Sequence, residues 1–162
     1  AAPFRTTNTV GPTGRISVGR GHPFCARRGP ALMLVLDASA LVGWIMPDEQ
    51  GIDLHDLASR HDDILAPWLL WAELRNILVV NERRGRLPAG SAEQITDAVD
   101  GLGIVLDTSP ANAVVLDLAR RHRLTVYDAL YLELALRHGA SLASLDAALL
   151  GAAKAEGVQI VS

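Results

Sequence analysis

The chain has 162 residues, a length typical of one domain and sufficient to bury a core without disulfide bonds or a structural metal ion. Nearly half of the residues are apolar (49%), and the single cysteine, Cys25, excludes an intrachain disulfide and fits a reducing compartment. No apolar run approaches the ~20 residues that a membrane-spanning helix needs.

The net charge of −3 combines two unlike segments. Residues 1–32 contain five arginines and no acidic residue, so residues 33–162 contain 10 basic and 18 acidic residues, a net charge of −8. An acidic body is not typical of a protein that holds nucleic acid by bulk positive charge. It suits a site for divalent cations and a partner with basic residues.

Residues 1–32 are rich in Gly, Pro, Thr, Ser and Arg and lack hydrophobic periodicity or the continuous apolar segment of a signal peptide. This composition predicts a disordered extension outside the domain. We expect the domain to cover residues 33–162, with Met33 as its first residue. An organelle transit peptide and a nucleic-acid-binding arm are alternative interpretations of the extension.

From Met33 onward, short apolar runs alternate with helical patterns. In chain order, the predicted elements are a strand at 34–37, helices at 39–45 and 52–60, a strand at 63–66, a long helix ending near 84, a helix at 88–102, a strand at 104–107, helices at 110–122 and 127–138, a strand at 141–145, a helix at 147–156 and a strand at 158–161. Ser109 is expected to cap the helix at 110, and Gly85 and Gly139 to end helices. The alternation predicts an α/β domain with a parallel sheet covered by helices on both faces.

Three aspartates lie where predicted strands or extended segments end. Asp37 ends the first strand, Asp146 follows the strand at 141–145, and Asp128 begins a helix after an extended segment at 124–127. Because sites in open parallel sheets form at the carboxyl ends of strands, we expect all three to open onto one edge. For any one of them alone, helix capping is the commoner explanation.

Glu73 has no comparable structural explanation. It lies in the segment 68–80, which is apolar on nearly every helical face, and no cation lies three or four residues away. A buried, unpaired carboxylate is costly, so we expect a partner from outside the helix, either a metal ion or a distant arginine. Asn76, one turn later, could orient the carboxylate or contact a substrate.

Four carboxylates in one crevice would repel one another, and a divalent cation would remove the conflict. Mg²⁺ and Mn²⁺ prefer oxygen ligands and can activate water for attack on a phosphodiester. The sequence contains no nucleophile elbow, P-loop or dinucleotide-binding motif. The histidines form no ligand set, and His55, His61 and His122 are expected on the solvated surface. Arginines near helix ends, at 83–86 and 120–123, could contact phosphates.

Four segments that carry these residues resemble, in order, the motifs of the PIN-domain family. Residues 34–41 resemble the first motif, an Asp that ends a strand with a Ser or Thr two residues later. Residues 71–78 resemble the second, a Glu followed three residues later by Asn. Residues 127–135 are similar to the third, in which Asp precedes Ala-x-Tyr. Residues 141–149 resemble the fourth, although Ser144 stands where relatives often carry Thr. The single-domain length is similar to that of VapC-type toxins.

The resemblance implies a PIN-like three-layer sandwich, with about five parallel strands and helices on both faces. It implies Asp37, Glu73, Asp128 and Asp146 as catalytic, metal-binding acids, supported by the hydroxyls of Ser39 and Ser144. The implied activity is Mg²⁺- or Mn²⁺-dependent endonucleolytic cleavage of RNA, such as tRNA or rRNA, by metal-activated water. The implied biology is that of a cytoplasmic, homodimeric toxin of a type II toxin–antitoxin pair, silenced by a cognate antitoxin and without a membrane partner.

Three alternatives were weighed against this interpretation. A receiver-like phosphoacceptor domain needs a lysine at a late strand end, but the only lysine, Lys154, lies in the last predicted helix. A dehalogenase-type phosphatase needs Asp-x-Asp where this chain has Asp37-Ala38-Ser39. A catalytically silent PIN-like binding module is disfavoured by the four intact acids.

Overall fold

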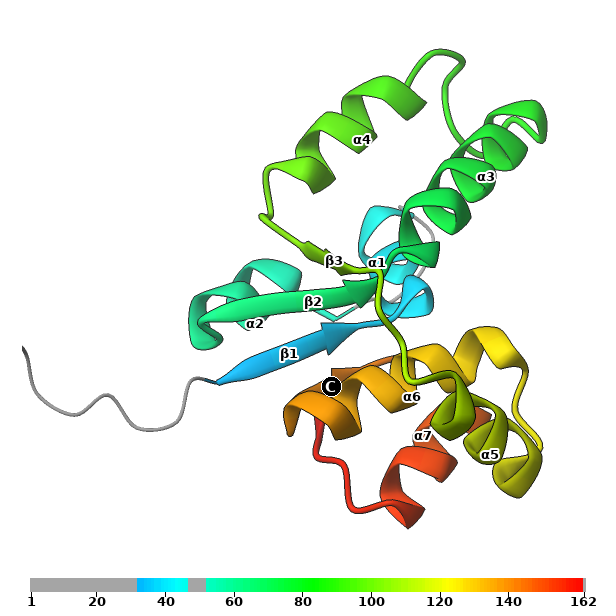
Figure 1. Ribbon diagram of the computed structural model, residues 1–162. Helices are drawn as coiled ribbons and strands as arrows, with labels where there is room; N and C mark the ends of the chain where they lie inside the picture. The colour runs from blue at the N-terminus through cyan, green and yellow to red at the C-terminus, as the bar shows by residue number, and fades with distance from the viewer. Residues whose placement is uncertain (1–31, 47–51, 162) are drawn as a thin grey trace, which may run out of the picture.

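The computed structural model describes residues 32–46 and 52–161, and the predicted extension therefore lies outside the described residues except for Leu32 (Figure 1). The described elements alternate between short strands and helices. They are β1 (Met33–Leu36), α1 (Ala38–Ile45), α2 (Leu54–Arg60), β2 (Asp63–Pro67), α3 (Leu69–Arg83), α4 (Ala92–Asp100), β3 (Val105–Asp107), α5 (Asn112–His122), α6 (Val126–His138), β4 (Ser141–Ala143), α7 (Ala147–Ala155) and β5 (Ile160–Val161). Within this part of the chain, no helix has both the length and the apolarity to span a bilayer.

The five strands form one parallel sheet in the order β3-β2-β1-β4-β5. Leu34 of the central strand β1 pairs with Ile64 of β2 on one side and with Ser141 of β4 on the other. The chain first builds outward from β1 through β2 to β3 and then returns to place β4 on the opposite side of β1. The direction of winding therefore reverses between β1 and β4, and open α/β sheets form their sites at such a point.

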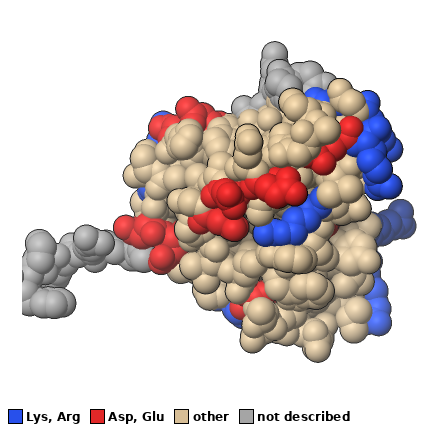
Figure 2. Space-filling model, turned by 90° about the horizontal axis from the view of Figure 1, so that it is seen from above, with Lys and Arg blue, Asp and Glu red and all other residues tan. Residues whose placement is uncertain are grey.

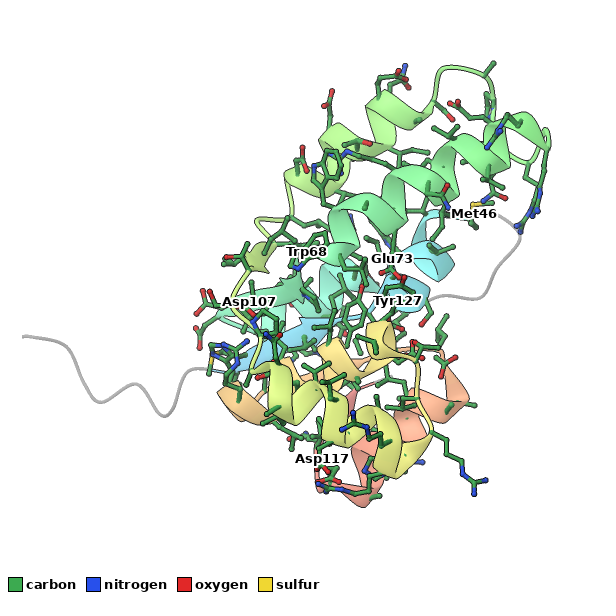
Figure 3. All side chains as sticks on the ribbon, turned by 45° about the vertical axis from the view of Figure 1, so that its right-hand side comes forward. Met46, Trp68, Glu73, Asp107, Asp117 and Tyr127 are labelled. Atoms are coloured by element: carbon green, nitrogen blue, oxygen red, sulfur yellow. The ribbon has the colours of Figure 1, made fainter. Side chains whose placement is uncertain are left out.

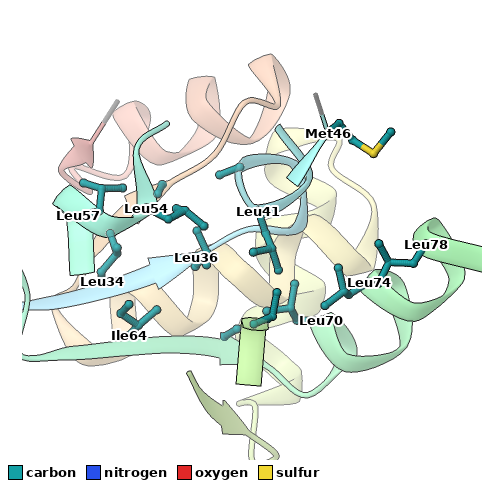
Figure 4. Packing of buried hydrophobic residues seen from close by; sticks show 14 of the residues in the cluster. Leu34, Leu36, Leu41, Met46, Leu54, Leu57, Ile64, Leu70, Leu74 and Leu78 are labelled. Atoms are coloured by element: carbon teal, nitrogen blue, oxygen red, sulfur yellow. The ribbon is translucent and has the colours of Figure 1, made fainter. Parts of the chain in front are cut away.

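Apolar side chains of β1 point alternately to the two faces of the sheet. Leu34 and Leu36 join a core with α1, α2 and α3, against which Val99 of α4 also packs (Figure 4). Val35 joins a second core with α5, α6 and α7. Helices thus cover both faces of the sheet, which confirms the predicted three-layer α/β architecture.

Two predicted helix starts are wrong. The helix predicted from 88 begins only at Ala92, whose N–H donates to the Glu82 carboxylate at 2.8 Å, while the hydroxyl of Ser91 makes no hydrogen bond within the described part. Ser109 does not cap α5, because that helix begins two residues beyond Pro110, after Ala111. A carboxylate from the preceding helix can replace a local cap, which local sequence patterns do not reveal. The predicted helix ends at Gly85 and Gly139 are confirmed by left-handed φ values of 69° and 60°.

A buried ion-pair network ties the end of β3 to α6. Glu133 is 2% exposed and accepts from the Arg137 guanidinium at 2.8 Å and, at 3.3 Å, from the backbone N–H of Ala111 before α5. Arg137 also pairs with Asp107 at 2.5 Å. The sequence pattern did not single out Glu133, although Arg137 lies four residues later on the same helix. We assign this network to stabilising the β3–α5 connection.

Candidate active site

Asp37 lies directly after β1 at the carboxyl edge of the sheet and is only 6% exposed. Its backbone N–H donates to the Ala143 carbonyl of β4 at 2.9 Å, which continues the pairing of the two central strands. Asp37 occupies the N-cap position of α1, but its side chain makes no capping hydrogen bond. Capping therefore does not explain this carboxylate.

The Asp37 carboxylate instead accepts two hydroxyl hydrogen bonds. Ser39 donates to Oδ2 at 2.5 Å and Ser144 donates to the same oxygen at 2.7 Å. Each serine oxygen also accepts a backbone N–H, that of Leu145 at 2.8 Å for Ser39 and that of Asp146 at 3.0 Å for Ser144. Because these N–H groups occupy a lone pair of each hydroxyl oxygen, the hydroxyl protons are free for Asp37. The two serines thus join the ends of β1 and β4 and orient the buried carboxylate.

Glu73 lies on α3 beside the buried stripe formed by Leu70, Leu74 and Leu78 and is itself half-buried. Its Oε2 accepts a hydrogen bond from the Tyr131 hydroxyl at 2.6 Å, and Tyr131 is 1% exposed. The prediction of a partner from outside the helix is confirmed, but in the structure that partner is a tyrosine and not an arginine.

Asn76 follows Glu73 by one turn and is exposed. Among the described residues, its side chain makes no hydrogen bond. The carboxylate of Glu73 is therefore oriented by Tyr131 here, and contact of Asn76 with a substrate stays a prediction. Tyr131 lies within the third motif quoted above, three residues after Asp128, and this spacing on one helix face was the signal that could have identified it.

Asp128 is half-buried in the first turn of α6. It is not the N-cap that its position suggested. Thr125 is the N-cap, and its hydroxyl oxygen accepts the N–H of Asp128 at 3.1 Å and donates to Oδ2 of Asp128 at 2.7 Å. Thr125 and Asp128 thus exchange two hydrogen bonds, which fix the start of α6 and the orientation of the Asp128 carboxylate.

Burial shifts the pKa of both Asp37 and Glu73, and repulsion between carboxylates adds to the shift of Glu73. Burial raises the pKa of Asp37 above its ordinary value, although the two serine hydroxyls oppose the shift. Burial also raises the pKa of Glu73; the Tyr131 hydrogen bond opposes this shift, and the negative charges of Asp37 and Asp128 add to it. Burial and the adjacent Glu73 raise the pKa of the Tyr131 hydroxyl, so it remains a donor at neutral pH. Asp37 and Asp128 are therefore close enough to Glu73 to act on it electrostatically.

Asp146 differs from the other three acids. It is exposed, and its Oδ1 accepts the Leu149 N–H at 2.7 Å, so it caps α7 as the structural explanation predicted. Its backbone is nevertheless tied to the Asp37 network through Ser144. Within residues 32–46 and 52–161, no three acidic, histidine or cysteine side chains are arranged to hold a metal ion. In this structure the charges of Asp37 and Asp128 act on Glu73, whereas Asp146 is bonded to its own helix, and the convergence of all four carboxylates stays a prediction.

Comparison with known proteins identifies the family. The sequence profile of the PIN domain matches residues 34–155. The chain belongs to the PIN-domain family. It is 31% identical over 118 residues to Ribonuclease VapC3 of Pyrobaculum aerophilum, an alignment that covers 71% of this chain and 90% of that protein. The fold is similar to the crystal structure of PAE2754 from Pyrobaculum aerophilum, with a TM-score of 0.63, 26% identity and coverage of 81% of this chain and 92% of the other. It also resembles FitAcB from Neisseria gonorrhoeae, with a TM-score of 0.57, 20% identity and coverage of 80% and 97%.

The donor set of this PIN domain suits a hard divalent cation. Asp37, Glu73 and Asp128 offer carboxylate oxygens, the ligands that Mg²⁺ and Mn²⁺ prefer. Burial disfavours the negative charge of Asp37 and Glu73, repulsion adds to this for Glu73, and a bound cation would remove that penalty. Among the described residues, no histidine side chain bonds to these three acids. His122, expected to be solvated, is 15% exposed and contacts Glu156 at 2.6 Å, because the ends of α5 and α7 lie together.

Proposed function

We propose that this PIN domain is a Mg²⁺- or Mn²⁺-dependent endoribonuclease and the toxin of a type II toxin–antitoxin pair. The main observation in its support is Asp37, a buried carboxylate without a capping role that two serine hydroxyls hold at the switch point of the sheet. The similarity to a relative named as a VapC ribonuclease supports the choice of RNA.

In this proposal, Asp37, Glu73 and Asp128 hold the cation, and Asp146 adds a carboxylate from the end of β4. When bound, the cation supplies an activated water and stabilises charge on the departing oxygen of the phosphodiester. Ser39 and Ser144 keep the Asp37 carboxylate oriented. The Tyr131 hydroxyl orients Glu73 and favours its ionised form, because a hydrogen bond to a carboxylate stabilises the charge.

We further propose a cognate antitoxin, a second copy of this chain and structured RNA such as tRNA or rRNA as partners, in the cytoplasm. Seen from the side of α3 and α4, acidic side chains gather over the middle of the surface, with basic side chains both directly beside them and along an edge (Figure 2). The exposed acids of α4 are Glu93, Asp97 and Asp100. This distribution supports an antitoxin that contributes basic residues.

The test is cleavage of a tRNA pool by the purified domain, freed of antitoxin, with Mn²⁺, with Mg²⁺ and with chelator. We expect discrete products that require metal and disappear in Asp128→Asn. Asp117→Asn is the matched control, because Asp117 is an exposed aspartate of α5 that pairs with Arg121 on the surface. Equal cleavage by wild type and Asp128→Asn would contradict the assignment of the site.

A catalytically silent binding module is the second candidate. It is favoured by the engagement of Asp146 in capping and by the lack of a preformed three-ligand site among the described residues. Calorimetric titration with Mn²⁺ separates the two candidates. Binding that is lost in Asp37→Asn supports the nuclease, and no binding at millimolar Mn²⁺ supports the silent module.

A further inference from the structure

Large apolar side chains are exposed directly beside two of the site acids. Val126 and Tyr127, which precede Asp128, are 47% and 60% exposed. Leu145, which precedes Asp146, is 43% exposed. Among the aromatic side chains of the described residues, Tyr127 has the largest exposed fraction. Apolar surface beside an acidic crevice is suited to contact with the flat faces of a ligand, in addition to any contact with its charge.

Tyr127 lies on the face of α6 that is turned toward Glu73. It precedes Tyr131 by four residues, so the two tyrosines are neighbours on one side of the helix. Tyr131 uses that side to reach Glu73. In the view of Figure 3, Tyr127 stands in the first turn of α6 with Glu73 of α3 above it.

The structure gives Tyr127 no role in folding. Its hydroxyl makes no hydrogen bond and its ring makes no aromatic contact within the described residues. Tyr131, by contrast, is buried and bonded to a carboxylate. Of the two tyrosines, one turn apart, Tyr131 therefore binds Glu73 within the fold, whereas the exposed ring of Tyr127 is available to a ligand at the rim of the site.

We propose that Tyr127 is a stacking platform for an unpaired nucleobase next to the phosphodiester that is cleaved. This inference rests on the proposed ribonuclease function and narrows its substrate to RNA that presents an unstacked base, in a loop or a single strand. Aromatic rings bind splayed-out bases by stacking, which every base permits, whereas paired RNA exposes mainly phosphates and 2′-hydroxyls. An acidic body with a net charge of −8 over residues 33–162 gives little attraction for the phosphates of a duplex, which makes the contribution of stacking larger.

The experiment compares a stem-loop RNA that wild type cleaves with versions in which an abasic residue replaces, in turn, each nucleotide that flanks the cleaved bond. Wild type, Tyr127→Phe and Tyr127→Ala are assayed with Mn²⁺, with Leu116→Ala as control because Leu116 is 43% exposed on α5. Tyr127→Ala should raise KM on the order of tenfold, the usual scale of losing one base–aromatic stack. The KM values of Tyr127→Phe and Leu116→Ala should stay within about twofold of that of wild type, since Tyr127→Phe keeps the ring and Leu116 lies on a different helix.

The abasic RNAs provide the decisive comparison. With wild type, one of the abasic RNAs should have a KM raised by about the same factor as Tyr127→Ala raises the KM of the intact RNA. With Tyr127→Ala, the same abasic RNA should have a KM little higher than the intact RNA, because both changes remove the same contact. Additive losses would overturn the stacking assignment. A change of oligomeric state in Tyr127→Ala, measured by light scattering, would also overturn it and assign the ring to a protein interface. Metal-dependent cleavage by wild type with no effect of Tyr127→Ala would refute the platform alone, whereas no metal-dependent cleavage by wild type would refute both the nuclease and the platform.

Discussion

Substitution of Tyr131 by phenylalanine isolates the hydrogen bond that orients Glu73. The ring keeps its volume and its buried position, so no cavity forms, and only the 2.6 Å bond to the carboxylate is lost. Hydrogen bonds to charged groups contribute about 1.5–3 kcal/mol. Because Glu73 is only half-buried, we expect the lower end of that range, a loss of about 1.5 kcal/mol. For a domain of this size, that loss corresponds to a fall of about 5 °C in the unfolding temperature.

Chemical and thermal unfolding of the metal-free domain at about pH 8 and about pH 4.5 provide the assay. The loss should shrink at the lower pH, because burial raises the pKa of Glu73 above its ordinary 4.5 and the protonated carboxyl no longer forms a charge-assisted bond. Tyr127→Phe is the matched control: it removes an exposed hydroxyl one turn earlier and should change stability by less than about 0.5 kcal/mol. Equal stability of the two variants at the higher pH would contradict this prediction. So would a stability loss in Tyr131→Phe that is as large at the lower pH as at the higher pH.

Three further predictions concern other parts of the domain. The pKa of Glu73 is raised in the folded, metal-free state, so this state retains a proton that the unfolded state has released. Rising pH should therefore lower the free energy of unfolding of wild type relative to that of Glu73→Gln, as measured by urea unfolding. Adding Mn²⁺ should remove this difference. Arg137→Met should cost about 3 kcal/mol by leaving the buried Glu133 carboxylate unpaired, whereas Arg60→Met, at an exposed pair, should cost less than about 0.5 kcal/mol; equal losses would contradict the network assignment. Arg123→Gly should stabilise the domain by about 1 kcal/mol, because Arg123 ends α5 with a left-handed φ of 55°, which glycine adopts more readily. An unchanged unfolding temperature would contradict this prediction.

The architecture could be predicted because its determinants are local. Alternating short apolar runs and helical patterns require a parallel sheet with helices on both faces, and the run from Leu34 to Leu36 marks its buried central strand. Helix boundaries were less predictable where a distant group acts as the cap. The N–H of Ala92 is satisfied by Glu82, ten residues earlier, so the local sequence before α4 does not mark its start.

The sequence suggested candidate site residues, but it did not reveal the partners that the structure gives them. The hydroxyl that binds Glu73 comes from Tyr131, 58 residues later, and depends on how α3 and α6 pack against the sheet. Ser144 reaches Asp37 across 107 residues because β4 returns to lie beside β1. A crossover of this kind is a property of the strand order, which hydrophobic periodicity does not encode. Thr125, by contrast, bonds to Asp128 only three residues later, a local spacing that the sequence contains, although the predicted helix began at residue 127 and Thr125 was not identified as its cap.

In the structure, the hydrogen bonds at the helix starts distinguish the aspartates from one another, which the sequence alone could not do. Asp146 gives an oxygen to the N–H of Leu149, and Asp128 exchanges hydrogen bonds with its own N-cap, so both contribute to helix stability without any ligand. Asp37 stands at the start of α1 with no capping bond, and its donors are two hydroxyls that have little other use for their protons. Asp37 is buried at an energetic cost and, unlike Asp146, accepts no capping hydrogen bond with its side chain, so its position is the one that a bound ligand would best explain. For this reason we expect Asp37→Asn to abolish Mn²⁺ binding, and Asp146→Asn, which alters a carboxylate already occupied as a helix cap, to weaken that binding less.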